Sequence, residues 1–508
     1  MNKFKIGWAE VSITPDKKIS LLGQFAERIS QYVEKPITVT AMAIECGSEH
    51  VIFCSCDLGG TSWNLVESVR KKLKDENVNF DTNNVILNAT HVHTGPGYGG
   101  ARRLEINSGG VIPALITMLK GFLKPGQKYI ESQKIANNPE IATSSENFEF
   151  LTDRITKAVI KAWDNRKESS FKSAFGRAAV GMCRRAVYTN ETAQMWGDTN
   201  TPEFKELEGG NDSGIELLFV FDDEKKISGI IVNLACPAQC VQHRLFVSPD
   251  FWGEVKVLLR KRFGEHIFIL PQCSAAGDQC PVDLVRWVEP ESDINDPNCT
   301  RNNPPKRKAD PSMFDLAGMR VVGRRIANEI IAVYEEDVSE FQTEAEFEHR
   351  VIDMNLPLRR ATEIDKETAE KSIREYLDKK QDNVNYNDVA KLQIHLGVLK
   401  RYEQQKTVEH IQTEIHIIRF GSVAFATNPF ELFLDYGNRI RAQIDCEQVF
   451  LIQLANGTEG YLPTKKAEKH GHFSAFISSG QVGHDGGNLL VTQTLESINE
   501  MFKKKRQV

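Results

Sequence analysis

Two histidines in the stretch NATHVHTGPG, His91 and His93, are the residues of this chain best suited to chemistry. The chain has only 12 histidines among 508 residues, and these two are separated by one residue and followed by a Gly-Pro-Gly turn. Residues two apart in a strand point to the same face, so both imidazoles could approach one metal ion, or one could bind while the other orients. The alternative is a pair of partly buried histidines that hydrogen-bond to the turn at 95–97.

Other reactive groups also follow apolar stretches that are typical of strands. Open α/β sheets bind ligands at the carboxyl ends of their strands, so we expect these groups to share one cleft. A carboxylate and a phenol could complete a mixed nitrogen and oxygen shell around zinc, with a position left open for water. The groups are Asp57, Cys236 with Cys240, Asp278 with Cys280, Glu431 and Tyr461.

The turn GDQCP at 277–281 has two interpretations. Asp278 could orient a histidine, and Cys280 could be a nucleophile if its thiolate is stabilised. Alternatively, Cys280 is a small buried residue on a loop. The CPAQC stretch does not predict a structural zinc cluster, because such a cluster needs a second close pair of thiols, and Cys273 with Cys280 has the wrong spacing.

The pattern of apolar residues predicts an α/β fold. Apolar strands are expected at 38–47, 50–60 and 84–93, with an amphipathic helix at 64–76 between the second and third. We expect mixed sheet layers flanked by helices, with the ligand cleft at the carboxyl ends of the strands. A helical hairpin is predicted at about 357–406. The polar stretches near 100–147, 189–213 and 286–312 suit active-site loops.

The charge and composition of the chain indicate which kinds of binding partner to expect. There are 63 basic and 69 acidic residues, a net charge of −6, so no nucleic acid partner is expected. No run of about 18 apolar residues occurs, and the first residues lack the apolar core of a signal peptide, so membrane insertion and secretion are not predicted. Ten scattered cysteines favour a reducing compartment, and we predict a cytoplasmic protein acting on a small molecule. The oligomeric state is not predicted.

Five motifs together resemble one known family. GWAEVSITP (7–15) is similar to G-x-A-x-x-D-I-T-P, NATHVHTGPG (88–97) to N-A-T-H-T-H-S-G-P-G, and GDQCP (277–281) to G-D-x-S-P. NPFELF (428–433) is similar to P-G-E-x-F, and NGTEGYLPT (456–464) to N-x-Y-x-x-Y-x-x-T. In this order they resemble the neutral/alkaline non-lysosomal ceramidases. The resemblance implies one catalytic domain over 1–508, without the C-terminal β-sandwich of the ceramidases.

The resemblance implies a zinc-dependent hydrolase that cleaves an N-acyl amide with a metal-activated water. His91, Glu431 and Tyr461 would be zinc ligands, and His93 would bind the substrate or the attacking water. Tyr461 would also stabilise the oxyanion, and Cys280 would occupy the position of the family's active-site serine, beside Asp278. Two further implied roles are those of Asp57 beside the metal-binding strand ends and of Arg184 or Arg185 near the substrate.

Two departures from the family pattern leave alternatives open. The family's second histidine ligand belongs to a C-H-P sequence, where this chain has Pro237. His243, Cys236 or Cys240 could replace it. The serine position holds Cys280, so a second hypothesis is a cysteine hydrolase that uses Cys280 with Asp278 and a histidine. A third hypothesis is a ligand-binding protein that has lost a zinc ligand and its catalysis. The substrate is not predicted.

Overall fold

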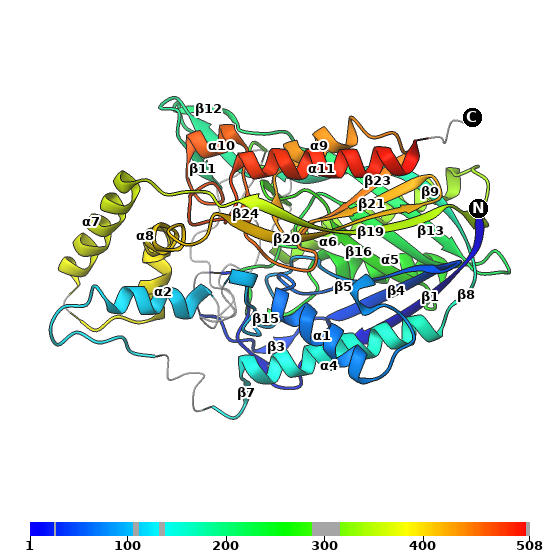
Figure 1. Cartoon of the computed structure of the whole chain (residues 1–508), viewed down its shortest axis with the longest axis horizontal. Coiled ribbons are helices and arrows are strands. Elements are labelled where there is room, and N and C mark those ends of the chain that lie inside the picture. Colours follow the sequence, from blue (N-terminus) through cyan, green and yellow to red (C-terminus); the bar gives the residue numbers. More distant parts are fainter. Residues whose placement is uncertain (25–26, 105–110, 132–137, 287–314, 381, 504–508) are drawn as a thin grey trace.

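Three sheets surround a shared apolar core, and helices cover their outer faces (Figure 1). The computed structural model describes residues 1–508 except 25–26, 105–110, 132–137, 287–314, 381 and 504–508. The arrangement confirms the predicted α/β class.

The first sheet is built from the amino-terminal strands. Its order is β18–β1–β4–β5–β6, and the short strand β8 (Lys167–Glu168) also pairs with β1. Helices α1 (Trp63–Asp75) and α4 (Ser144–Asp164) bury their apolar faces against it. Helix α1 agrees with the helix predicted at 64–76. Its strands are β18 (Glu344–Ala345), β1 (Asn2–Ser12), β4 (Thr38–Cys46), β5 (Glu49–Cys56) and β6 (Val85–Ala89).

The second sheet has the order β16–β14–β13–β9–β17. Helices α5 (Phe251–Phe263) and α6 (Asp315–Glu336) pack on its outer face. Its strands are β16 (Phe268–Cys273), β14 (Ile227–Leu234), β13 (Asp212–Phe221), β9 (Ser170–Cys183) and β17 (Gln279–Cys280).

The third sheet has the order β19–β20–β21–β23. Helices α9 (Leu434–Arg441) and α11 (His484–Phe502) cover it. Its strands are β19 (Phe347–Pro357), β20 (His410–Phe420), β21 (Val423–Thr427) and β23 (Gln448–Ile452).

The strands of the first sheet contribute side chains to two cores. One core lies between the three sheets, and the other lies between the sheet and its helices. In β4, Met42 and Ile44 face the core shared by the three sheets, whereas Ala41 and Ala43 face α1 and α4. Successive side chains of a strand point to opposite faces, so strands that are buried on both sides carry nearly continuous apolar runs.

Each sheet contains one parallel pair of strands, and these pairs carry the site. The pairs are β5 with β6, β14 with β16, and β21 with β23. Parallel strands end at the same edge of a sheet, so the segments after them meet where the three sheets converge. Two of those segments pair directly, as the parallel two-residue strands β22 (Glu431–Leu432) and β24 (Tyr461–Leu462).

The stretches predicted as loops are partly structured. The 189–213 region contributes to a three-stranded sheet formed by β10 (Arg185–Tyr188), β11 (Ala193–Met195) and β12 (Phe204–Leu207). The 100–147 region contains α2 (Val111–Lys120) and the short strand β7 (Ile141–Ala142), which pairs with β2 (Lys18–Ile19). Most of the 286–312 stretch lies outside the described residues.

A helical projection stands at one end of the molecule (Figure 1). It consists of α7 (Glu363–Lys379) and α8 (Tyr386–Gln404), which pack with α2 around a separate apolar cluster. Helices α7 and α8 begin with capping boxes, in which Thr362 and Asn385 satisfy the first free amide groups. The remaining short elements are β3 (Tyr32–Val33), which pairs with β15 (Phe246–Val247), the 3-10 helix η1 (Thr82–Asn84) and α10 (Lys465–His470).

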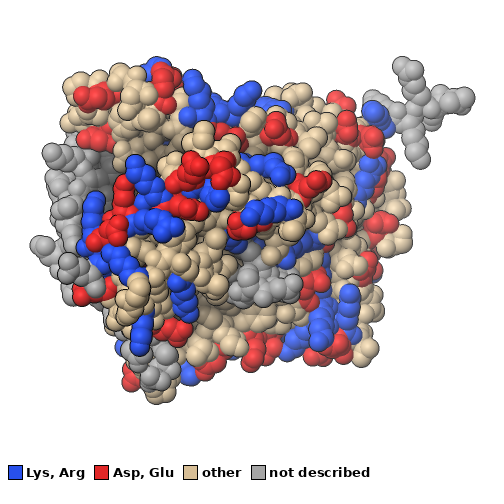
Figure 2. Space-filling view, turned by 60° about the vertical axis from the view of Figure 1, so that its left-hand side comes forward, with Lys and Arg blue, Asp and Glu red and all other residues tan. Residues whose placement is uncertain are grey.

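Charges of both signs are mixed on the surface shown in Figure 2, as the small net charge suggests. Such a face lacks the broad basic patch that attracts nucleic acid. Among the described residues, no helix combines the length and the apolar character that crossing a bilayer requires.

The shared core gives a test of the fold. Phe53 of β5 is fully buried, and its ring lies 5.0 Å from that of Phe425 in β21, so it ties the first sheet to the third. We expect Phe53→Ala to lower the free energy of unfolding by about 3–5 kcal/mol, because it leaves a cavity between two sheets. Val338→Ala, at a position that is 96% exposed, should change it by less than about 0.5 kcal/mol in the same denaturant titration. Equal effects of the two substitutions would contradict this packing.

Candidate functional site

His91 lies at the centre of the site in a strained backbone conformation. Its φ is +63°, in the left-handed region that residues with a β-carbon rarely adopt. Its Nδ1 lies 2.5 Å from the carbonyl oxygen of Gly59, and its Nε2 lies 3.3 Å from Oε2 of Glu431. A carbonyl oxygen only accepts, so Nδ1 carries the hydrogen and, in the neutral ring, Nε2 directs a lone pair at the Glu431 carboxylate.

Glu431 and Tyr461 face His91 from the paired strands β22 and β24. The Tyr461 hydroxyl hydrogen-bonds to the Glu431 carboxylate. Burial alone would raise the pKa of Glu431, but His91, Arg184 and Tyr461 outweigh that effect and hold the pKa below its usual range. Burial and the nearby Glu431 charge raise the pKa of Tyr461, so its phenol is neutral at pH 7. Of the predicted ligands, the structure brings His91, Glu431 and Tyr461 together.

Arg184 follows β9 and connects Tyr461 with Gln239. Its Nη2 donates to the Gly277 carbonyl at 2.8 Å and to the Tyr461 hydroxyl at 3.3 Å, and its Nη1 donates to Oε1 of Gln239 at 3.3 Å. Arginine cannot accept a hydrogen bond, so the Tyr461 hydrogen is free to be donated to Glu431. The same constraint places the oxygen of Gln239, and not its nitrogen, toward Arg184.

His93 is held neutral between two glutamines. Gln239 turns its nitrogen to Nε2 of His93 at 3.0 Å, and Nδ1 of His93 lies 3.0 Å from Oε1 of Gln242. Nε2 therefore accepts, Nδ1 donates, and both ring nitrogens are used. Burial, and then the nearby charges of His91, Arg28 and Arg184, lower the pKa of His93 well below its usual value. In this arrangement His93 orients Gln239 and is not placed to take up a proton.

Two residues that the sequence analysis overlooked pack around His93. Arg28 is buried and donates to four carbonyl oxygens, those of Leu22, His93, Gln242 and Arg244. A β-carbon on Gly23, whose φ is +98°, would lie 2.2 Å from the His93 ring, so only glycine fits there. Neither Arg28 nor Gly23 belongs to a motif that would identify it from the sequence. Gln239 and Gln242 could have been suspected only because they follow a buried strand.

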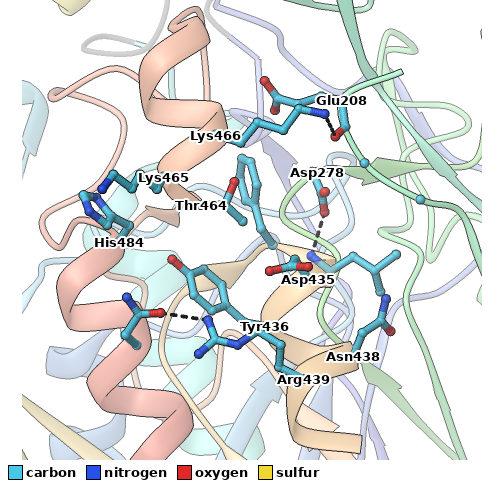
Figure 3. A pocket seen from close by; sticks show the side chains of 15 residues that line it. Glu208, Asp278, Asp435, Tyr436, Asn438, Arg439, Thr464, Lys465, Lys466 and His484 are labelled. Atoms are coloured by element: carbon cyan, nitrogen blue, oxygen red, sulfur yellow. Dashed lines mark hydrogen bonds between the residues drawn. The ribbon is translucent and has the colours of Figure 1, made fainter. Parts of the chain in front are cut away.

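Asp278 turns its carboxylate away from the His91 group. Its Oδ1 accepts from the Leu434 amide at 2.8 Å, and so caps α9, whose own N-cap residue provides no side-chain hydrogen bond (Figure 3). Asp278 also lines a polar cavity of about 360 Å³ with basic residues such as Lys465 and Arg439. Burial raises the pKa of Asp278. Asp278 therefore makes a helix-capping contact, and no histidine of the described ranges forms a hydrogen bond or ion pair with it.

Cys280 is fully buried in β17, next to Val282. Its Sγ lies 3.2 Å from the Val282 carbonyl oxygen, and burial raises the pKa of the thiol to about 12. Arg184 opposes this shift but does not cancel it. A thiol with that pKa is protonated at pH 7, so the structure gives no support to Cys280 as a nucleophile.

Arg185, the second predicted substrate-binding arginine, is occupied by the protein itself. It forms a two-pronged pair with Glu208 and donates to the carbonyl oxygens of Phe473 and Gly471 and to the Ser474 hydroxyl. These contacts hold a loop whose Phe473 ring packs edge-on against Tyr461, 5.5 Å between centroids. Arg185 thus supports Tyr461 and has no donor directed at the site.

The proposed replacements for the missing histidine lie elsewhere. Nε2 of His243 is 3.4 Å from Oδ1 of Asp315, which also pairs with Arg244. Cys236 directs its Sγ to the Val180 carbonyl oxygen, and Cys240 hydrogen-bonds to Asp250. Over the described ranges, no three histidine, cysteine, aspartate or glutamate side chains form a group that could hold a metal ion. His243 is therefore not grouped with His91 and Glu431.

Asp57 supports the strand end that carries His91. Its carboxylate accepts from the Thr38 amide at 2.9 Å and from the Thr90 hydroxyl at 3.4 Å, directly before His91. Lys256 lies 3.8 Å away and offsets its charge. Asp57 therefore contacts the residue before His91 and does not contact His91 through a hydrogen bond among the described residues.

The donor atoms of His91 and Glu431 are of the types that bind zinc. A lone pair on Nε2 of His91 and a carboxylate that face each other are two acceptors, so a proton or a metal ion must lie between them. A histidine that binds a metal usually donates its other ring hydrogen to a carbonyl or carboxylate, as His91 does to Gly59. His91, Glu431 and Tyr461 are therefore donors of the types that zinc accepts.

Asp250 gives a pH test of the loop that positions Gln242. Its carboxylate accepts from the Val241 and Phe251 amides, and burial raises its pKa to about 6. The pKa of an unfolded aspartate is about 3.9, so folding favours the protonated form and Asp250 weakens stability as the pH rises from about 4 to about 6. We expect the unfolding free energy of the wild type, minus that of Asp250→Asn, to fall by about 2 kcal/mol between pH 4 and 7. A pH-independent difference in denaturant titrations would contradict the assignment.

Comparisons with known proteins support the fold alone. No family model matches the chain, and no curated protein matches it either. Among solved structures, the neutral ceramidase from Pseudomonas aeruginosa superposes with a TM-score of 0.67 at 15% identity, over 99% of this chain and 75% of that one. A structure described as a ceramidase complexed with C2 gives a TM-score of 0.64 with the same identity and coverage. The chain has a fold similar to that of neutral ceramidase.

Proposed function

We propose that this protein is a hydrolase that cleaves an amide, or a related acyl bond, at the His91–Glu431–Tyr461 site. The observation that carries the proposal is the pair of acceptors, Nε2 of His91 and the Glu431 carboxylate, which face each other at 3.3 Å. The fold shared with neutral ceramidase supports the same class of reaction. The substrate is expected to be a small molecule.

Zinc is the proposed cofactor, held by His91, Glu431 and Tyr461. When bound, zinc lowers the pKa of a bound water and polarises a carbonyl group. Gly59 holds the His91 ring in the required tautomer, and the Gly277 carbonyl and Tyr461 hydroxyl hold Arg184 beside it. The N–H groups of Arg184 that bind neither Gly277, Tyr461 nor Gln239 are donors suited to the negative charge that develops on an attacked carbonyl oxygen.

His93 has a different role in this proposal from the one that the family resemblance implies. Because both its nitrogens are bonded to glutamines, it acts as a positioning residue that holds Gln239 against Arg184. Tyr461 is placed by Arg184 on one side and by Phe473 on the other. The chain thus directs its donors and acceptors without a second histidine ligand.

The test is zinc analysis of the purified protein together with hydrolysis of a panel of N-acyl amides, followed as released amine. We expect about one zinc per chain, reduced to below about one tenth in His91→Ala and Glu431→Gln, with a loss of about 100-fold or more in kcat/KM. His410→Ala, at an exposed histidine, is the matched control and should change neither quantity. Thermal unfolding of each variant shows whether it is folded.

Two outcomes would contradict the proposal. Hydrolysis that survives both His91→Ala and chelation, but not alkylation by iodoacetamide, would favour the cysteine mechanism through Cys280. A wild-type protein that takes up no zinc and releases no amine, yet binds N-acyl compounds, would favour a ligand-binding protein. The second outcome draws on a specific observation, since Pro237 stands where the family pattern places a histidine ligand.

A further inference from the structure

Asn456 joins the first sheet to the third, in the segment that leads from β23 to Tyr461. This segment runs along β6, where the Leu454 carbonyl oxygen accepts from the Ala89 amide at 3.3 Å. The Asn456 amide then donates to the Leu87 carbonyl oxygen at 2.9 Å. The segment therefore acts as a short extra strand beside β6, the last strand of the first sheet.

The side chain of Asn456 completes this pairing where the backbone turns. Its φ is +51°, in the left-handed region that asparagine tolerates better than most residues with a β-carbon. In a regular antiparallel pair the Leu87 amide would donate to a backbone carbonyl, whereas here it donates to Oδ1 of Asn456 at 2.8 Å. A backbone N–H only donates, so the atom that faces it is the side-chain oxygen, and Nδ2 is left to donate elsewhere.

An ion pair holds the other end of the Asn456 amide. Nδ2 lies 3.0 Å from both Oε1 of Glu414 and Nε2 of His416. Arg70 in turn grips Glu414 with two nitrogens, at 2.8 and 3.1 Å. Burial alone would raise the pKa of Glu414, but hydrogen bonds from His416 and Arg70 outweigh it and hold the pKa below its usual range. The side chain of Asn456 is therefore fixed from both sides, and the residue is only 3% exposed.

Both stretches that Asn456 ties together lead into the proposed site. Strand β6 leads to His91, and the stretch after Asn456 leads to Tyr461. On the way, the Gly460 carbonyl oxygen accepts from the Glu431 amide at 2.9 Å, so the strand pair β22–β24 moves with this stretch. The attachment of Asn456 to β6 therefore bears on the spacing between His91 on one side and Glu431 and Tyr461 on the other.

We propose that Asn456 is a positioning residue that sets the spacing between His91 and the Glu431–Tyr461 pair. This inference rests on the proposed function for the chemistry of those three residues. A displacement of about 1 Å at a reacting group can cost about 100-fold in rate. An asparagine with a purely structural role would instead lower stability and leave the folded variants with unchanged chemistry.

Hydrogen exchange of the zinc-free protein, followed by mass spectrometry, measures the contact without any activity. Asn456→Gly removes both side-chain contacts, and glycine adopts a φ of +51° without strain. We expect peptides that cover 87–93 and 456–462 to exchange at least about tenfold faster in this variant than in the wild type. Peptides of α11, which lies on the outer face of the third sheet, should exchange at the wild-type rate.

Zinc binding and kinetics of the same variants measure the consequence for the site. In Asn456→Gly we expect the dissociation constant of zinc to rise at least about tenfold. At saturating zinc, kcat should fall at least about tenfold and KM should change less than about threefold, because Asn456 bonds to the protein and not to the substrate. Asn456→Asp keeps the oxygen that accepts from Leu87, so it should recover part of the zinc affinity, and it tests the inference if Asn456→Gly fails to fold.

Asn385→Ala is the matched control. The Asn385 side chain also accepts from a backbone amide, at the start of α8 in the helical projection. Its replacement should change neither the exchange of the two peptides nor the binding of zinc.

Three results would overturn the inference. The first is wild-type exchange of either peptide in a folded Asn456 variant. The second is an equal acceleration in α11, which identifies a general loss of stability. The third is wild-type zinc affinity and kcat in the folded variants of a protein that does bind zinc.

The outcome is separate from that of the proposed function. Faster exchange of the two peptides alone, in a protein that takes up no zinc and releases no amine, would contradict the proposed function and leave the positioning contact standing. Zinc-dependent hydrolysis that Asn456→Gly leaves unchanged would do the reverse.

Discussion

The polarity of the whole site depends on one constraint, that the Arg184 guanidinium can only donate hydrogen bonds. Two chains of hydrogen bonds start from it. One runs through the Tyr461 hydroxyl to Glu431 and ends facing His91, and the other runs through Gln239 to His93 and on to Gln242. Tyr461 and Gln239 each accept from Arg184, so each can only donate to its next partner. The buried cation therefore sets the direction of the tyrosine hydrogen and the tautomer of His93. The glutamine orientations follow from the same rule.

Such a polar group is tolerable inside an apolar core only if almost every donor and acceptor is satisfied. An unmet buried group costs about 1–3 kcal/mol. The three sheets meet this demand by ending their parallel strand pairs at one place, so that backbone groups of Gly59 and Gly277 and side chains from all three sheets reach each other. Close approach matters as well, since a β-carbon on Gly277 would lie 2.2 Å from the Glu431 carbonyl oxygen. The site is therefore a product of how the sheets converge, and not of any one motif.

The sequence predicts the parts of this design that depend on local pattern. Apolar runs identify the strands and helices around His91, and reactive residues directly after strands identify the convergence of His91, Glu431 and Tyr461. It does not predict which face of a loop a side chain presents. His243 follows Gln242 directly, yet it turns to Asp315 while Gln242 turns to His93. The three-stranded sheet that includes 204–207 is likewise formed by short strands whose pairing depends on tertiary contacts and not on periodicity.

The loss of a histidine ligand at Pro237 and the contact between Arg184 and Gln239 are best understood together. An imidazole at the place of Gln239 could accept from Arg184 and donate to a neighbour, but it could not also present a lone pair to a metal ion. Gln239 performs the bridging with two separate atoms, an oxygen toward Arg184 and a nitrogen toward His93. The site thereby keeps a fixed positive charge within it, and in the described part of the chain Glu431 is the carboxylate that both His91 and Tyr461 engage. Burial alone would lower the pKa of Arg184, but the nearby Tyr461 and Glu431 raise it, so the charge of the guanidinium is balanced by groups of the site itself.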